Sequence, residues 1–438
     1  MQRNNRVIIG WMILLIFMSC AAPKKSTTIV STTAVELPKE SEPVENKEDA
    51  FFIDMFKKYP GMMDSILAHR KEWKVQIIYT QINRNANGIP SFTHHYFNQK
   101  NEGYFYPAST VKFPVALLAL EKLNDLNING LDKNAAMITE AAYSGQTPVY
   151  NDPNTSNGKP SIAQYIKKIL LVSDNDAYNR LYEFLGQEHI NAALHKKGYK
   201  NVQLLHRLSI FLSEDENRHS NPVSFFDNSN RLLYSQPMLY NRKVYAKRND
   251  VLGKAFYSNG NLVNEPMNFS TKNNIALADL HQVLLSLVFP NAVSASQRFN
   301  LTDVDRRFVL QYMSQLPSES VYPTYDSSYY DAYVKFILFG SEKGSLPKNI
   351  RIFNKVGNAY GQLTDVAYIV DFEKKLEFMV SATIYCNSDE TLNDDKYDYD
   401  NIGYPFMKNL GKILYDYEVK RKRNFLPDLS SLIFTYDK

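Results

Sequence analysis

The stretch that organises this chain is Phe105-Tyr-Pro-Ala-Ser-Thr-Val-Lys-Phe-Pro-Val-Ala-Leu-Leu-Ala-Leu-Glu-Lys-Leu123, in which Ser109 and Lys112 precede an apolar segment. Every residue from Phe113 to Leu120 is apolar, which predicts a helix buried on all sides. If this helix begins near Ser109, the Lys112 amine lies one turn away on the same face and reaches the Ser109 hydroxyl. A desolvated lysine can take the proton of a serine and so activate it as a nucleophile. A helix cap followed by an ordinary helix lysine is the alternative interpretation of the spacing.

The first residues are predicted to be a targeting signal. Two arginines precede an apolar run from Val7 to Met18, which is too short for a membrane span of about 20 residues but typical of a secretory signal. The run ends before Cys20 in a pattern that resembles the bacterial lipoprotein signal. Residues 1–20 are therefore interpreted as a lipoprotein signal peptide with Cys20 as the lipidation site, and an ordinary cleaved signal is the alternative. The expected location is the periplasmic side of the bacterial cell envelope, with a lipid anchor in the membrane.

Residues 21–49 are rich in Ser, Thr, Pro, Glu and Lys and contain no aromatic residue, which predicts a flexible tether. Residues 50–438 are enough for one large domain, or for two intimately packed ones, with a sizeable core. The net charge of +4 is small and no basic stripe is present, so we expect no nucleic-acid partner, and we expect a monomer. The only cysteines are Cys20 and Cys386, so no intrachain disulfide can form if Cys20 is lipidated.

Apolar spacing and turn residues predict strands near both ends of the chain and helices between them. The expected strands are residues 75–80, 94–97, 352–358, 365–371 and 376–385. The expected helices are residues 50–71, a helix from 109, residues 162–170, 177–185, 271–288, 303–315 and 405–420. Residues 218–268 lose these patterns and are interpreted as an insertion with some hairpin character. The predicted fold class is α/β (α+β), with one sheet built from both chain ends, an all-helical lobe packed against it and a cleft between them.

Two further motifs accompany Ser109 and Lys112. Ser173-Asp174-Asn175 follows a predicted helix directly, and Lys355-Val356-Gly357 lies on a predicted strand. Helix capping explains the first equally well when it is taken alone, and a solvated lysine beside a bulge explains the second. In this order and context, however, the motifs together resemble the Ser-x-x-Lys, Ser-Asp-Asn and Lys-Thr-Gly motifs of the penicillin-recognising serine hydrolase family. The nearest groups are the class A β-lactamases and the serine D,D-peptidases, and the segment 359–369 also resembles the family's strand turn.

The resemblance implies an acyl-enzyme mechanism. Ser109 would attack the carbonyl carbon of a β-lactam or a peptide amide, and Lys112 would take or relay its proton. Backbone N–H groups of Ser109 and Asn358 would form the oxyanion hole. Ser173 would pass a proton to the departing nitrogen.

The resemblance also implies how substrate is bound. Asn175 would hold Lys112 and the substrate's side-chain amide, while Lys355 would attract the substrate carboxylate and lower the proton affinity of Ser173. Gly357 would leave the strand open to the substrate, because a side chain there would block its approach. The family's sheet is antiparallel, has five strands and is covered by helices.

Two departures from the family pattern affect the expected chemistry. Val356 replaces a hydroxyl residue that in the family helps bind the substrate carboxylate, so one hydrogen bond worth about 0.5–1.5 kcal/mol is missing or is supplied by another residue. The Glu-x-x-Leu-Asn pattern that supplies the deacylation base in class A β-lactamases is also missing. Glu214 and Glu216 are the candidates for this base, although a charge run in a polar stretch is usually a solvated loop.

The leading hypothesis is a serine β-lactamase-like hydrolase that acts on β-lactam amides through an acyl-enzyme. The alternative is a D,D-peptidase or penicillin-binding enzyme that acts on D-Ala-D-Ala-like peptidoglycan stem peptides. A second alternative is a non-catalytic, wall-associated lipoprotein. The histidines show no zinc-ligand spacing and the acidic run Asp394–Asp400 is interpreted as a surface turn, so we expect no metal and no cofactor.

Overall fold

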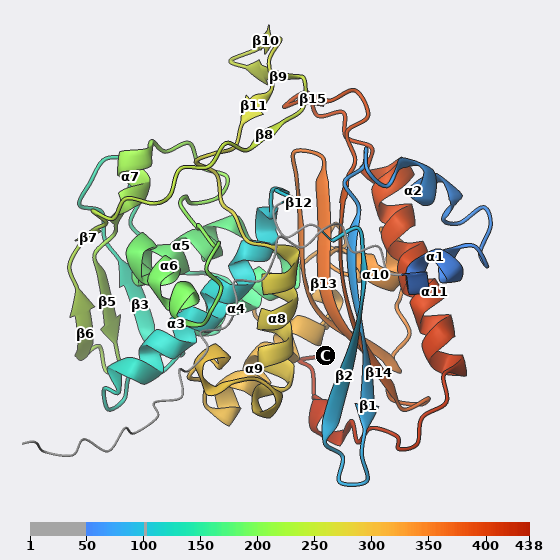
Figure 1. Ribbon diagram of the computed structural model, residues 1–438. Helices are drawn as coiled ribbons and strands as arrows, with labels where there is room; N and C mark the ends of the chain where they lie inside the picture. Colours follow the sequence, from blue (N-terminus) through green and yellow to red (C-terminus); the bar gives the residue numbers. More distant parts are fainter. Residues whose placement is uncertain (1–49, 100–102) are drawn as a thin grey trace, which may run out of the picture. The chain divides into compact units, whose positions relative to one another are not determined.

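The computed structural model describes residues 50–99 and 103–438, so the predictions for the signal peptide, Cys20 and the tether lie outside the described residues. A five-stranded antiparallel sheet is built from both ends of the chain, as predicted (Figure 1). Its order is β12-β13-β14-β1-β2, which leaves β12 on one edge. The strands are β1 (Gln76–Arg84), β2 (Pro90–Phe97), β12 (Ile350–Ala359), β13 (Gln362–Asp371) and β14 (Leu376–Tyr385). β13 and β14 are buried along their whole length, because helices cover both faces of the sheet.

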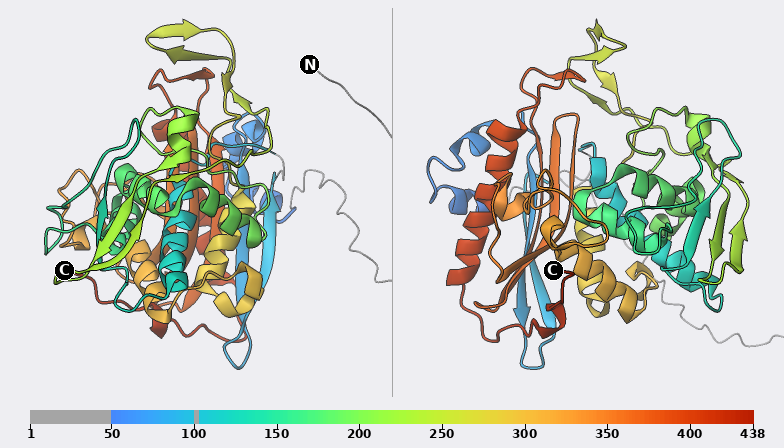
Figure 2. Two further views of the ribbon diagram at one scale, coloured as in Figure 1. Left: turned by 90° about the vertical axis from the view of Figure 1, so that its left-hand side faces the viewer. Right: turned by 180° about the vertical axis from the view of Figure 1, so that it is seen from behind.

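One face of the sheet packs against helices from the two chain ends (Figures 1 and 2). These helices are α1 (Ala50–Phe56), α2 (Asp64–His69), α10 (Phe336–Phe339) and α11 (Tyr404–Lys420). The single helix expected over residues 50–71 is wrong, since two short helices occupy it. Pro60 and Gly61 separate them, and Gly61 has a φ of +82° that a helix does not allow.

The other face packs against α8 (Leu277–Val288) and α9 (Asp303–Ser314), beyond which lies the helical lobe. α8 begins six residues later than expected, because Asn274 instead pairs its backbone with Gln203. The helices of the lobe are α3 (Lys112–Leu126), α4 (Ile162–Val172), α5 (Asn175–Leu185), α6 (Gln187–Lys196) and the short α7 (Glu214–Arg218). Every residue of α3 from Lys112 to Glu121 is buried, which confirms the predicted central helix.

The expected all-helical lobe is wrong, because the lobe also contains a small sheet. This sheet has the order β3-β5-β6 and consists of β3 (Ala136–Thr139), β5 (Val223–Phe226) and β6 (Leu232–Gln236). The rest of the insertion forms short strands, as its hairpin character suggested (Figure 1). They are β4 (His219–Ser220), β7 (Leu239–Tyr240), β8 (Val251–Leu252), β9 (Ala255–Ser258), β10 (Asn261–Val263) and β11 (Met267–Asn268), with β15 (Thr391–Leu392) pairing to β9.

Short helical turns complete the described chain. They are η1 (Ala108–Val111), η2 (Pro290–Ala292), η3 (Ala295–Gln297), η4 (Pro317–Glu319), the π-helical η5 (Tyr399–Gly403) and η6 (Ser430–Leu432). Among the described residues, no helix combines the length and the apolar character needed to cross a bilayer.

Gly411 shows how tightly the outer helices pack. A Cβ atom at this position would lie 2.2 Å from the backbone N and 2.6 Å from the Cα of Leu338, so α11 approaches the backbone of α10 more closely than any side chain would allow. Backbone atoms cannot move aside as a flexible side chain can. Gly411 is therefore needed for this contact.

We expect Gly411→Ala to lower the free energy of unfolding by about 1–3 kcal/mol, the usual cost of overpacking a close contact. Urea denaturation followed by circular dichroism measures the change. The control is Gly344→Ala, because a Cβ there would have no atom within 4 Å. Equal unfolding midpoints for the two variants would contradict the predicted overlap.

Candidate active site

Ser109 stands at the mouth of a cleft of about 540 Å³ between the lobe and β12. It is half-buried and belongs to η1, which leads directly into α3. The preceding residue, Ala108, has a φ of +46°, a left-handed conformation that is strained for alanine and turns the chain sharply before the serine. The cleft is lined by Ser109, Ser173, Asn175, Ser209, Val356 and Asn358 and by seven aromatic residues, Tyr106, Tyr330, Tyr333, Phe336, Tyr360, Tyr397 and Tyr404.

The Ser-Asp-Asn motif lies between two helices, as predicted. Ser173 ends α4 in the left-handed conformation, with a φ of +60°. Asp174 caps α5 by accepting a hydrogen bond from the Ala177 N–H at 2.8 Å, and Asn175 is the first residue of that helix. The helix capping given above as an alternative explanation of the motif therefore does occur. It also turns the Ser173 and Asn175 side chains toward one point.

That point is the Lys112 amine, which lies beneath the cleft. Lys112 Nζ donates to the Ser173 carbonyl oxygen at 2.5 Å and to Asn175 Oδ1 at 2.7 Å, and it lies 3.3 Å from Ser173 Oγ. Burial lowers the pKa of Lys112 to about 7, while the nearby Asp174 carboxylate opposes the shift. The shift favours the neutral form of Lys112, and a neutral amine can accept a proton.

Lys355 approaches the same serine from β12. Its Nζ donates to Ser173 Oγ at 2.7 Å and to the Val356 carbonyl at 2.8 Å. Burial and then the nearby Lys112 charge hold the pKa of Lys355 well below its ordinary value. Since Lys355 donates to the Ser173 oxygen, the Ser173 hydroxyl proton is free to point toward a neutral Lys112. The three side chains form a hydrogen-bonded path through which a proton can pass.

Gly357 also permits a close backbone contact that was not expected. A Cβ atom at this position would lie 2.6 Å from the Pro107 carbonyl oxygen and 3.0 Å from the backbone N atoms of both Ser109 and Thr110. The first obstacle to a side chain is thus the backbone that leads into α3. Gly357 allows β12 to lie directly against the Ser109 amide, where the next residue on the strand, Asn358, also lines the cleft.

The structure corrects the expectation that Glu214 or Glu216 acts as a base, because neither carboxylate lines the cleft. The Glu216 carboxylate accepts hydrogen bonds from the Ser213 N–H and hydroxyl, both at 2.8 Å, and from the Ser144 hydroxyl at 2.8 Å. This forms a capping box at the start of α7, and the Ser213 bond is the main cause that lowers the pKa of Glu216. Glu214 pairs with Arg218 at 2.7 Å on the protein surface.

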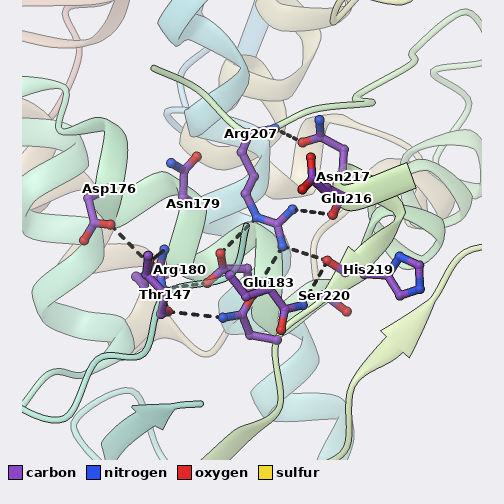
Figure 3. A network of polar contacts seen from close by, with 12 residues as sticks. Thr147, Asp176, Asn179, Arg180, Glu183, Arg207, Glu216, Asn217, His219 and Ser220 are labelled. Atoms are coloured by element: carbon purple, nitrogen blue, oxygen red, sulfur yellow. Dashed lines mark hydrogen bonds and ion pairs between the residues drawn. The ribbon is translucent and has the colours of Figure 1, made fainter. Parts of the chain in front are cut away.

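The loop that carries these acids is wrapped around a buried arginine (Figure 3). Arg207 donates to Glu183 Oε1 at 2.9 Å, to the Glu216 carbonyl at 3.1 Å and to the His219 carbonyl at 2.8 Å. Glu183 is buried and also pairs with Arg180 at 3.0 Å. The guanidinium therefore binds the backbone of the loop and leaves its carboxylates on the outside.

Several cleft residues were not found from the sequence. Ser209 Oγ accepts a hydrogen bond from Asn175 Nδ2 at 2.8 Å and so extends the Ser-Asp-Asn cluster. The acidic run interpreted as a surface turn reaches the cleft, where Asp395 is the one carboxylate among the described lining residues. The tyrosine-rich segment from Tyr322 to Tyr333 was visible in the sequence, but it has no period of 2 or 3.6 that would assign it to a face.

The chain was compared with a set of protein-family models, with curated proteins and with solved structures. A sequence model described as the β-lactamase enzyme family matches residues 63–417. No curated protein matches the sequence significantly. Solved structures that are similar include a β-lactamase from Xanthomonas campestris (13% identity, 81% of this chain and 98% of that chain, TM-score 0.44) and a class A β-lactamase from Clostridium kluyveri (13%, 81% and 97%, 0.45). A third is PBP-A (14%, 82% and 96%, 0.44).

The contact at Gly357 predicts that Gly357→Ala loses reactivity, and that a lower stability of the variant does not explain the loss. In Gly357→Ala, β12 must move away from the Ser109 amide, and we expect labelling of Ser109 by a fluorescent penicillin to slow by about 10²- to 10³-fold, the usual effect of losing one oxyanion donor. Gly411→Ala is the matched control, because it crowds a glycine in the outer helices. Equal labelling rates for the two variants would show that the approach of β12 to Ser109 is not needed.

Proposed function

The chain belongs to the β-lactamase enzyme family, and we propose that it is a serine enzyme that forms an acyl-enzyme at Ser109 with β-lactams and with D-Ala-D-Ala-like peptides. The observation that carries this proposal is the path Lys112–Ser173–Lys355. Two buried lysines that share one hydroxyl would be unfavourable in a purely structural arrangement, because neighbouring ammonium groups repel each other. Proton transfer along this path would explain why both lysines contact Ser173.

Acylation begins when Ser109 Oγ attacks the carbonyl carbon of the substrate amide and Lys112 Nζ takes the hydroxyl proton. The backbone N–H groups of Ser109 and Asn358 would hold the oxyanion of the tetrahedral intermediate. The proton then passes from Lys112 through the Ser173 hydroxyl to the amide nitrogen, whose bond to the acyl carbon breaks. Lys355 would hold a substrate carboxylate, which also favours the protonated form of Lys355.

Deacylation needs a base, and among the described residues the cleft offers few candidates for it. Hydrolysis of the ester needs a water that is held and deprotonated beside Ser109, and the acids of the Arg207 loop are engaged elsewhere. Lys112 remains as the base for this water. We therefore infer slow hydrolysis, which favours a penicillin-binding enzyme or D,D-peptidase over a rapid β-lactamase.

The rate of disappearance of the adduct tests this proposal. Intact-protein mass spectrometry of the full chain with a penicillin should show one added penicillin that persists from minutes to hours and is absent in Ser109→Ala. We expect Glu214→Gln and Glu216→Gln to form and lose the adduct as the wild type does. Rapid turnover by the wild type would establish the β-lactamase alternative, and no adduct under any condition would refute the acyl-enzyme.

The pKa of Lys112 predicts how acylation depends on pH. Lys112 must be neutral to take the Ser109 proton, so the rate of adduct formation should rise with pH through about 7 and level off above it. Lys112→Arg, which stays protonated, should lose about 10²- to 10⁴-fold in rate over the whole range. A rate that keeps rising to pH 10 would show that burial does not shift this lysine.

A further inference from the structure

A second cavity, of about 570 Å³, plays no part in the proposed reaction. It is lined by residues on either side of Leu208 and Ser209, which themselves line the catalytic cleft. Its other side consists of residues 244–249 of the insertion and the nearby segment 268–272. We call this cavity the insertion groove.

The groove exposes apolar side chains that no part of the described chain covers. Phe211 is fully exposed and Val244 is 86% exposed, and both line the groove together with Ile210 and Leu212. The Phe211 loop is held in place, since Asn217 Nδ2 donates to the Leu212 carbonyl at 3.3 Å. A partner that covers Phe211 therefore does not have to order the loop first, which lowers the entropic cost of binding.

One wall of the groove is a free backbone edge. The chain runs from residue 241 to residue 250 without a helix, a turn or a bend. The backbone N–H groups of residues 244–249 donate to no acceptor within the described part of the chain. Gln203 Nε2 fixes the segment by donating to the Ala246 carbonyl at 3.0 Å. An extended segment with free N–H groups is a template on which a peptide can add a strand.

The groove is also positively charged. Lys247 and Lys272 line it, and among the described residues neither ammonium group has an ion pair or a hydrogen bond. Glu214 is the one carboxylate among the described lining residues, and it is paired with Arg218 at 2.7 Å. Burial lowers the pKa of His206, which also lines the groove, to about 4, and the Lys272 charge adds to this shift. Two ammonium groups are thus available to a carboxylate.

The other acids of α7 do not line the groove. The Asp215 carboxylate accepts a hydrogen bond from the Tyr143 hydroxyl at 2.5 Å, and Glu216 accepts one from Ser144 at 2.8 Å. Their negative charge is therefore directed to residues outside the groove.

We propose that the insertion groove binds an extended acidic peptide. The peptide adds a strand along residues 244–249, packs an apolar side chain on Phe211 and places its carboxylates beside Lys247 and Lys272. A lipid surface would match the charges, but it would leave the concave groove unfilled and the free N–H groups without acceptors. The proposal does not depend on acyl-enzyme chemistry. Because Ser209 and Phe211 belong to one loop, the bound peptide would lie next to the catalytic cleft.

A short peptide with alternating apolar and acidic residues tests the groove. The probe is acetyl-Val-Glu-Val-Glu-Val-amide with a fluorophore, and fluorescence anisotropy measures its binding to the full chain. A matched peptide with glutamine in place of glutamate lacks the charge. Two further peptides are N-methylated at every second residue, one in each register, so that each lacks the hydrogen-bonding groups of one edge.

We expect the acidic peptide to bind about three- to tenfold more tightly than the glutamine peptide at low salt, the range for two partly exposed ion pairs. This ratio should approach one in the double variant Lys247→Gln, Lys272→Gln. Lys243→Gln is the matched control and should keep the ratio, because Lys243 is exposed on the same segment but does not line the groove.

The backbone and apolar contacts have their own signatures. N-methylation in one of the two registers should weaken binding about tenfold or more, because the added strand loses its main-chain hydrogen bonds. Phe211→Ser should weaken the acidic and the glutamine peptide alike, by about fivefold or more, since it removes apolar area and no charge. Circular dichroism melting checks that each variant is folded, so the test does not rely on the reactivity of Ser109.

The proposal is overturned if the wild type binds neither peptide at millimolar concentration, or binds the acidic and the glutamine peptide equally. It is also overturned if Lys243→Gln lowers the ratio as much as the double variant does, or if neither N-methylated peptide binds more weakly than the probe. Sedimentation with phosphatidylglycerol vesicles that is lost in Phe211→Ser, without any peptide binding, would assign the groove to a lipid surface instead.

Discussion

The site depends on the close approach of β12 to the start of α3. Gly357 is the residue that permits it, since a Cβ there would overlap the Pro107 carbonyl and press on the Ser109 amide. The contact joins the edge of the main sheet to the lobe and, at the same time, places Asn358 of β12 and Ser109 of η1 on one cleft. The absence of a side chain at residue 357 therefore allows β12 to bring Asn358 close to Ser109, and the N–H groups of these two residues form the proposed oxyanion hole.

Burial of cations is the second constraint, and it opposes stability. Lys112, Lys355 and Lys335 are all buried near β12, and burial lowers the pKa of each. Lys335 is satisfied by the Met313 carbonyl at 2.6 Å and by Asn354, whose amide in turn binds the buried Asp365. Within the described residues Lys112 and Lys355 form no ion pair, although Asp174 lies near Lys112 and Asp365 near Lys355, and the two lysines share Ser173. Because buried charges are costly, two lysines on one hydroxyl are best explained by a need for groups that exchange protons.

Local sequence patterns correctly predicted the elements that are stabilised mainly by interactions among residues close together in the sequence. The apolar run after Lys112 gives a helix buried on all sides, and Asp174 of Ser173-Asp174-Asn175 caps the helix that directly follows it. The start of α8 could not be predicted in this way, because Asn274 pairs its backbone with Gln203, which lies far away in the sequence. The capping box of Ser213 and Glu216 is a local signature that the sequence carried and that was not used, while the added bond from Ser144 comes from a distant residue.

The same reason explains why the acids of the Arg207 loop were misjudged and Asp395 was missed. Whether a carboxylate reaches the reacting atoms is decided by the partners that the fold gives it and by the surface that it lines. A capping box and an arginine engage the acids of the Arg207 loop, and their backbone binds Arg207. Asp395 follows the Lys355-Val356-Gly357 motif at about the same distance along the sequence as Glu214 follows Ser173-Asp174-Asn175. It was missed because no local pattern shows that its segment pairs with the insertion through β15 and β9, and this contact between distant residues is what brings the acidic run to the cleft.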